Sequence, residues 1–220
     1  MPILKKNNKT IYFAHIPKTA GTSVYSLFVE SGWKIGNIRR SENPNSSFQK
    51  LKSEFGNNIF LDNIHTLNFP HPIQHATYKT WKKWGPFDES FSILRDPIER
   101  FKSELKYQYQ IKDGNSEIDF KSFVEKKIML LSVRPWFFYR GFAGHLIPQH
   151  YFIGEKTILF DYDGDWLNNL SKRYDLHART EEIRKNVSNS QLQVEINYTT
   201  IKILKLFYYR DYILKNKFII

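Results

Sequence analysis

Short apolar segments alternate with longer amphipathic ones along the chain, and the two patterns predict different elements. Residues 10–16, Thr-Ile-Tyr-Phe-Ala-His-Ile, are mostly β-branched or aromatic and predict a buried strand. Similar short runs at 58–61, 91–94 and 157–160 predict three more strands. The stretch 34–57 is polar and poorly periodic, and it predicts a connection rich in loops.

Apolar residues three and four positions apart predict helices between these strands. Val24, Leu27 and Phe28 share one face of a helix expected over residues 22–30, which ends near Gly32. The same periodicity predicts helices over residues 119–131, 166–174 and 198–215.

A further helix is expected to begin after Asp96. Asp96 suits the N-cap position, Pro97 the first turn, and Glu99 has the capping-box spacing. Ile98, Phe101 and Leu105 then form the buried stripe of this helix. Strands that alternate with helices predict an α/β fold, in which helices flank a mainly parallel sheet. No linker divides the chain, so residues 1–220 are expected to form a single domain.

Composition and charge narrow the classes of partner. With 41% hydrophobic and 16% aromatic residues, the 220-residue chain is not wholly disordered. Its 33 Lys and Arg exceed its 22 Asp and Glu, and the net charge of +11 indicates an anionic partner: nucleic acid, a nucleotide, a membrane surface or an acidic glycan. The absence of cysteine excludes disulfides, thiolate zinc sites and cysteine nucleophiles. No signal peptide or membrane-spanning stretch is evident, so a cytoplasmic location is expected.

The loop after the first predicted strand has the composition of a phosphate site. Residues 17–21, Pro-Lys-Thr-Ala-Gly, lead to a helix N-terminus, where backbone N–H groups and the helix dipole attract anions. Lys18 adds a charge, Thr22 and Ser23 add hydroxyl donors, and Gly21 permits close approach of the backbone. The Walker A pattern is absent, which disfavours an ordinary ATPase or GTPase. A plain turn with a Thr cap is the alternative interpretation.

Arg95 and Ser103 form a second candidate anion site. Arg95 follows the strand 91–94 at its carboxyl end, where open α/β sheets bind their ligands. Ser103 lies about two helical turns further on. A guanidinium donates paired hydrogen bonds to a phosphate. An ion pair of Arg95 with Asp96 or Glu99 is the alternative.

These two segments resemble the sulfotransferase superfamily. Residues 15–23, His-Ile-Pro-Lys-Thr-Ala-Gly-Thr-Ser, resemble its 5′-phosphosulfate loop. Residues 92–103, Ser-Ile-Leu-Arg-Asp-Pro-Ile-Glu-Arg-Phe-Lys-Ser, resemble its 3′-phosphate motif. The pattern is most similar to carbohydrate sulfotransferases of the heparan sulfate 2-O-sulfotransferase type and to their bacterial relatives. The resemblance implies a P-loop-like sulfotransferase fold.

Weaker similarities extend the resemblance along the chain. They comprise the Pro148-Gln149 step, the Asn-Val-Ser loop at 186–188 and the Tyr-Arg-Asp-Tyr sequence at 209–212. Residues 160–163, Phe-Asp-Tyr-Asp, depart from the family, which usually has an Arg and a Glu after this strand.

The resemblance implies transfer of a sulfuryl group from 3′-phosphoadenosine 5′-phosphosulfate (PAPS) to a hydroxyl, in particular of a carbohydrate or glycolipid. The product is 3′,5′-diphosphoadenosine (PAP), and no metal is required. Lys18 would neutralise charge on the bridging oxygen, and Arg95 with Ser103 would bind the 3′-phosphate. The 5′-phosphate would be held by Lys18, Thr19, Ala20, Gly21, Thr22 and Ser23.

The resemblance also indicates a catalytic base. Residues 75–81 resemble a His-x-[Ser/Thr]-Tyr-x-x-aromatic stretch of the 2-O-sulfotransferases, and His75 precedes Arg95 by about 20 residues, as in that family. The family's histidine is the base, so His75 is expected to take the acceptor's proton. The other candidates for the base are His65, His71, His145 and His150.

Three other interpretations remain at the level of sequence. The charge and the Trp-Lys-Lys-Trp sequence at 81–84 are compatible with a nucleic-acid-binding protein, although no binding motif is evident and no nucleic acid is expected. A nucleotide phosphotransferase explains the first loop but not Arg95 and Ser103. The C-terminal helix carries Ile201, Leu204 and Tyr208 among lysines; it could lie on an anionic membrane or pack on the core.

Overall fold

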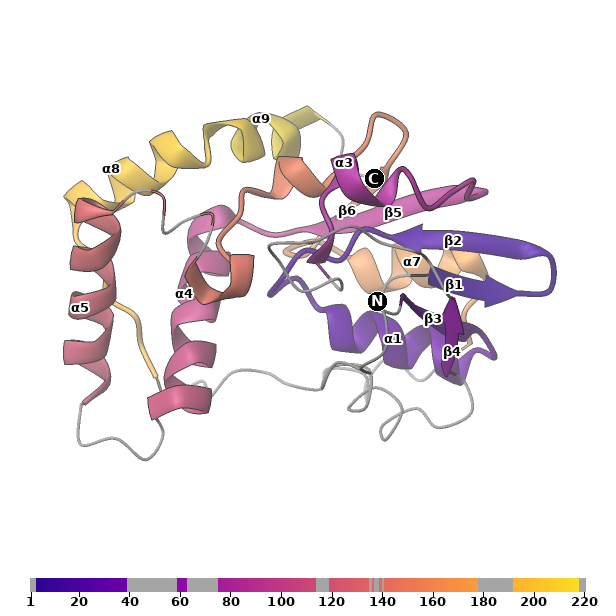
Figure 1. Cartoon of the computed structure of the whole chain (residues 1–220), viewed down its shortest axis with the longest axis horizontal. Helices are drawn as coiled ribbons and strands as arrows, with labels where there is room; N and C mark the ends of the chain where they lie inside the picture. The colour runs from indigo at the N-terminus through magenta and orange to yellow at the C-terminus, as the bar shows by residue number, and fades with distance from the viewer. Residues whose placement is uncertain are drawn as a thin grey trace.

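The computed structural model describes residues 3–38, 59–62, 75–113, 119–134, 136, 139, 141–177 and 192–217. It is an α/β structure with a six-stranded sheet in the order β4-β3-β1-β2-β5-β6 (Figure 1). The strands are β1 (Ile3–Lys6), β2 (Lys9–Phe13), β3 (Lys34–Ile38), β4 (Ile59–Asp62), β5 (Glu89–Leu94) and β6 (Ile158–Asp161).

The sheet is mixed, which corrects the expectation of a mainly parallel sheet. β2, β5 and β6 run parallel to one another, and β3 pairs parallel with β4. β1 lies between these groups and is antiparallel to both β2 and β3. A short hairpin places it there: Lys6 pairs with Lys9, and Asn7 adopts a φ of 53°, which Asn tolerates better than most residues. The parallel part of the sheet next to the candidate site is therefore β2, β5 and β6.

The helices follow the predicted pattern with two differences. Residues 198–215, predicted as one helix, form two, since the helix breaks at Tyr208, and the short helix α3 was not predicted. The helices are α1 (Gly21–Glu30), α3 (Tyr78–Trp81), α4 (Pro97–Gln108), α5 (Phe120–Val133), α7 (Trp166–Tyr174), α8 (Tyr198–Phe207) and α9 (Tyr209–Lys217), with a π-helical turn η3 (Tyr109–Asp113) and 3-10 turns η4 (Gly141–Gly144) and η5 (Gln149–Phe152).

Aromatic side chains fix the helices to the two faces of the sheet. On one face, Phe28 of α1 stacks on Phe91 of β5 at 5.7 Å between ring centroids, and α7 packs there too. On the other face, Tyr12 of β2 stacks on Trp81 of α3 at 4.3 Å. Figure 1 accordingly shows α1 below the sheet and α3 above it. The alternation of side chains along β2 thus supplies both cores.

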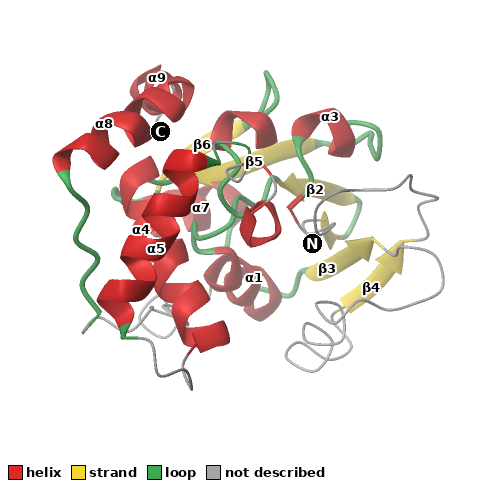
Figure 2. Ribbon diagram, turned by 60° about the vertical axis from the view of Figure 1, so that its left-hand side comes forward, coloured by secondary structure: helices red, strands yellow, loops and turns green. Residues whose placement is uncertain are grey.

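A separate helical layer adjoins the end of the sheet. α4, α5 and α8 share a core that includes Phe101, Leu105, Phe123, Leu204 and Tyr208 (Figure 2). Because Leu204 and Tyr208 are buried in this core, the apolar face considered above for membrane contact faces the protein interior.

Side-chain caps begin three of the described helices, α4, α5 and α8, and the sequence predicted the one at Asp96. Asp96 accepts hydrogen bonds from the backbone N–H groups of Ile98 (2.8 Å) and Glu99 (3.0 Å), and Pro97 is the first residue of α4. Asp119 caps α5 in the same manner. α4 is therefore fixed at the end that points back to β5 and the candidate site.

Candidate functional site

The loop between β2 and α1 is held in an unusual backbone conformation. Lys18 and Ala20 have φ angles of 66° and 64°, in the left-handed region that residues with a side chain seldom adopt. Thr19 lies between them, fully buried, and its hydroxyl donates to the carbonyl of Ile16 at 2.9 Å. Each left-handed residue costs on the order of 1 kcal/mol, and such strain is concentrated at functional sites.

The first turn of α1 retains backbone N–H groups that an anion could use. Ala20 is the N-cap and makes no side-chain cap, so the alternative of a turn capped by Thr does not describe this loop. Thr22 is half-buried and Ser23 buried within that first turn. Uncapped N–H groups at a helix N-terminus favour a negatively charged ligand.

Gly21 is required for a different reason from the one expected. A Cβ at this position would lie 1.9 Å from Nε2 of His15, far inside contact distance. The glycine therefore makes room for the imidazole of His15, rather than only for a ligand.

Arg95 joins this loop from the neighbouring strand. Its Nη1 donates to the carbonyl of Lys18 at 3.3 Å, and its guanidinium lies 4.5 Å from the centre of the Tyr162 ring. Within the described part of the chain it has no ion pair, because Asp96 caps α4 and Glu99 pairs with Lys102. The Nε of Arg95 is buried with no hydrogen-bond partner there. The guanidinium thus retains donors for a ligand.

A pocket of about 290 Å³ lies beside Arg95. Ser103 lines it together with Glu99, Lys102 and Lys106 of the same helix, and residues 193–195 add Glu195. Glu99 pairs with Lys102 at 2.7 Å, so Arg95, Lys106 and the hydroxyl of Ser103 are the groups that suit a phosphate-sized anion.

His75 lies close to the same loop. Its Nδ1 is 3.3 Å from the carbonyl oxygen of His15, and since a carbonyl only accepts, Nδ1 carries the hydrogen and Nε2 has a free lone pair. Burial lowers the pKa of His75 well below its usual value, and it lowers the pKa of His15 in the same way. Both rings are therefore neutral at pH 7.

Lys18 points toward α4 and is mostly buried. Its Nζ lies 4.0 Å from the centre of the Tyr107 ring. Burial is the main cause that lowers the pKa of Lys18; Glu104 opposes this effect and Arg95 adds to it. The aromatic ring attracts the ammonium group of Lys18 without neutralising its charge.

The sequence did not predict a hydrogen-bonded pair of His145 and Glu104 next to His75. Nδ1 of His145 lies 3.0 Å from Oε2 of Glu104, and the rings of His145 and His75 are 4.8 Å apart. Gln108 donates to the other oxygen of Glu104 at 2.5 Å, and Arg100 donates to the carbonyl of His145 at 2.7 Å. Arg100, Glu104 and Gln108 are four residues apart on α4, so a polar face at that spacing was the available signal.

Gln149 and Asp211, which belong to two of the weaker sequence similarities, together hold the backbone of Arg95. The side chain of Gln149 accepts from the Arg95 backbone N–H (3.1 Å) and donates to its carbonyl (2.8 Å). Asp211 in turn accepts from the backbone of Gln149 (2.8 Å) and from both the backbone (3.0 Å) and Nδ1 (2.8 Å) of His150. Nδ1 of His150, a candidate base, is thus held by the carboxylate that also holds the backbone of Gln149.

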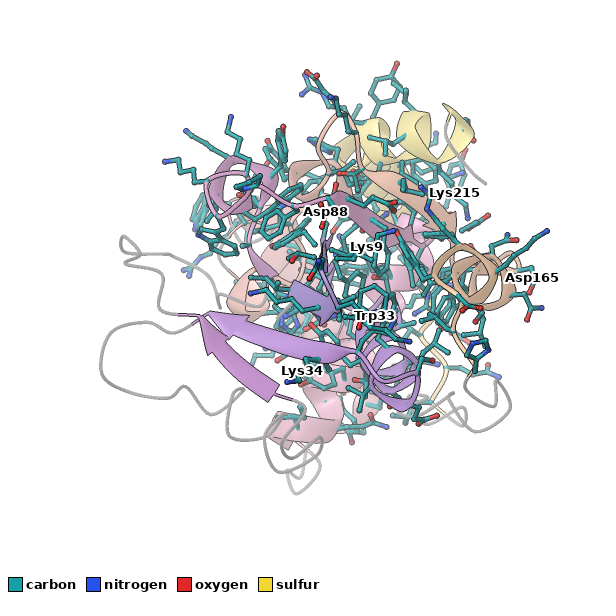
Figure 3. All side chains as sticks on the ribbon, turned by 90° about the vertical axis from the view of Figure 1, so that its right-hand side faces the viewer. Lys9, Trp33, Lys34, Asp88, Asp165 and Lys215 are labelled. Carbon is teal, nitrogen blue, oxygen red and sulfur yellow. The ribbon has the colours of Figure 1, made fainter. Side chains whose placement is uncertain are left out.

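The segment that departs from the resembled family also has a defined role. Tyr162 lies under Arg95, while Asp161 and Asp163 pair with Lys215 of α9 at 3.3 and 2.6 Å (Lys215 is labelled in Figure 3). The candidates His65 and His71, and the predicted loop at 186–188, lie outside the described residues.

Two broader findings concern the described residues. Every helix among them is too short or too polar to cross a bilayer. Their His, Asp and Glu side chains form no group of three or more that could hold a metal ion.

Comparison of the chain with family models, with curated proteins and with solved structures found no match.

Proposed function

We propose that the chain is a sulfotransferase that moves a sulfuryl group from PAPS to a hydroxyl of a carbohydrate or glycolipid. The observation that carries this proposal is the hydrogen bond from Arg95 to the carbonyl of Lys18. It joins two segments with anion-binding chemistry at the carboxyl ends of adjacent parallel strands. PAPS needs two such sites, one for its 5′-phosphosulfate and one for its 3′-phosphate, whereas a nucleoside triphosphate needs only the first.

The charges of the site suit in-line transfer to a hydroxyl oxygen. That oxygen forms a bond to sulfur while the bond from sulfur to the bridging oxygen breaks, and the electron pair stays with the 5′-phosphate of PAP. Lys18 neutralises the charge that develops there, and the N–H groups of the α1 first turn hold the phosphate. A neutral histidine takes the proton, and His75 is the candidate from the sequence.

The first test is calorimetric titration with PAP, in parallel with ATP and 5′-AMP. We expect PAP to bind at least tenfold more tightly than either, because only PAP carries a 3′-phosphate for Arg95 and Ser103. Arg95→Ala should weaken PAP binding by ten- to a hundredfold. Arg134→Ala is the matched control, since Arg134 is exposed at the end of α5.

Each result of this titration has a definite meaning. Wild-type PAP affinity in Arg95→Ala contradicts the assignment of the 3′-phosphate site. A preference for ATP contradicts the proposal as a whole and favours the phosphotransferase alternative.

A further inference from the structure

The clustered histidines His75 and His145 differ in their hydrogen-bond partners. His75 is only 4% exposed, and its Nδ1 hydrogen goes to a carbonyl, which is a neutral partner. Protonation would place a positive charge beside two other imidazoles, those of His15 and His145, whose ring centres each lie 4.8 Å away. Among the described residues, no carboxylate hydrogen-bonds His75 to offset that charge.

His145 has the partner that His75 lacks. The Glu104 carboxylate, itself fully buried, contacts Nδ1 of His145 at 3.0 Å. A carboxylate at Nδ1 keeps the hydrogen on that nitrogen, leaves the lone pair on Nε2, and stabilises the imidazolium that forms when Nε2 takes a proton. Gln108 fixes the second carboxylate oxygen, so the pair is rigid.

His145 and Lys18, the lysine proposed to neutralise the leaving group, both lie near the ring of Tyr107. The ring centre of Tyr107 is 6.1 Å from that of His145 and 4.0 Å from Nζ of Lys18. The His145 side chain remains 12% exposed, whereas that of Glu104 is 1% exposed. The imidazole thus retains some solvent-exposed surface, while its carboxylate partner is enclosed.

We infer that His145, positioned by Glu104, is the group that accepts the proton of the attacking hydroxyl. This inference rests on the proposed sulfuryl transfer and reassigns its base from His75. The proton passes to Nε2 of His145 as the hydroxyl oxygen bonds to sulfur, and the electron pair of the broken bond stays on the bridging oxygen near Lys18. His75 forms the wall of the site and hydrogen-bonds the loop at His15.

The test uses PAPS as donor and water as acceptor, so that no identified glycan is needed. Release of sulfate and PAP is measured for the wild type and for His145→Asn, Glu104→Gln, His75→Asn and the exposed control His177→Asn, together with the affinity of each for PAP. We expect a loss of at least a hundredfold in His145→Asn and at least tenfold in Glu104→Gln. His75→Asn should lose less than tenfold, and PAP affinity should stay within threefold throughout.

Two further readouts separate chemistry from a merely structural effect. Added imidazole should restore at least a tenth of wild-type turnover to His145→Gly. Nitrogen-15 NMR should show the neutral His145 ring with its hydrogen on Nδ1, and Glu104→Gln should remove that preference.

The outcomes distinguish this inference from the proposed function. Failure of the wild type to bind PAP overturns both. PAP binding without sulfate release overturns the inference alone, because the proposed function is transfer to a carbohydrate or glycolipid hydroxyl and not to water. PAP binding with turnover that survives in His145→Asn, or that depends more on His75 than on His145, overturns the inference alone. Loss of PAP binding in His145→Asn, without imidazole rescue of His145→Gly, assigns His145 a structural role and also overturns the inference.

Discussion

The guanidinium of Arg95 lies 4.5 Å above the ring of Tyr162, the residue that follows the last strand of the sheet. Tyr162 comes from a segment without the charges usual in the resembled family. Because an aromatic face attracts a cation without neutralising it, the stack orients Arg95 and leaves its donors for an anion. We therefore expect Tyr162 to position Arg95 for the proposed 3′-phosphate site.

Replacement of Tyr162 tests this relationship. Tyr162→Leu should weaken PAP binding about three- to tenfold, in keeping with a cation–π contact of ~1 kcal/mol. Tyr162→Phe keeps the ring and should bind within twofold of the wild type. Calorimetric titration measures both, and equal loss in the two variants would assign the effect to the hydroxyl instead of the ring.

The contact between Gly21 and His15 predicts a steep loss of stability. Gly21→Ala would place a Cβ 1.9 Å from the imidazole, so we expect a loss of ~2–4 kcal/mol in the free energy of unfolding, measured in urea. Gly164→Ala is a matched control, because the nearest atom to its Cβ would be at an ordinary 3.5 Å. The double variant His15→Ala/Gly21→Ala should recover part of the loss; a double variant as unstable as Gly21→Ala would place the clash elsewhere.

Acid should destabilise the fold through its buried histidines. Burial lowers the pKa of His15 and His75 in the folded state, so the unfolded chain binds protons that the native chain does not. Stability is then nearly constant above the unfolded pKa near 6.5 and falls below it, by up to about 2.7 kcal/mol per pH unit for two such groups. Urea unfolding between pH 8 and pH 5 measures this slope.

Variants identify the histidines responsible for that slope. His75→Gln should reduce it by about half, whereas His177→Gln should leave it unchanged, since the His177 side chain is 74% exposed. A slope that survives in the double variant His15→Gln/His75→Gln would show that other groups carry the acid sensitivity.

Asp211 should affect both stability and donor binding. Asp211→Asn removes a buried carboxylate that accepts from Gln149 and His150, so we expect a loss of ~3 kcal/mol in stability. Since Gln149 holds the backbone of Arg95, PAP affinity should fall as well. Asp175→Asn at an exposed helix end is the control, and unchanged PAP affinity in folded Asp211→Asn would contradict the connection.

The sequence predicted those elements whose pattern is local. The apolar runs of β2, β5 and β6 and the capped start of α4 were found at nearly their observed bounds. β1 and β3 were missed because Lys5, Lys6 and Lys34 make them polar, and their partners in the sheet supply the hydrogen bonds that stabilise them.

The sequence likewise predicts one part of the candidate site and not another. Lys18 and Arg95 could be placed together because both follow parallel strands, and carboxyl ends of such strands meet at one edge. The pairing of His145 with Glu104 joins residues 41 positions apart, with α5 between them in the sequence. The polar face of α4 is visible in the sequence, but no local pattern identifies His145 as its partner.

The hydrogen bonds of Asp211 also set an order of events during synthesis of the chain. The loop at Lys18 leaves the ribosome early, but the backbone of Arg95 is clamped by Gln149, which depends on Asp211 far later in the sequence. A chain that has not yet reached Asp211 therefore lacks the carboxylate that holds the backbone of Gln149. The backbone position of Arg95, early in the chain, thus depends on a residue that is added only near the end of synthesis.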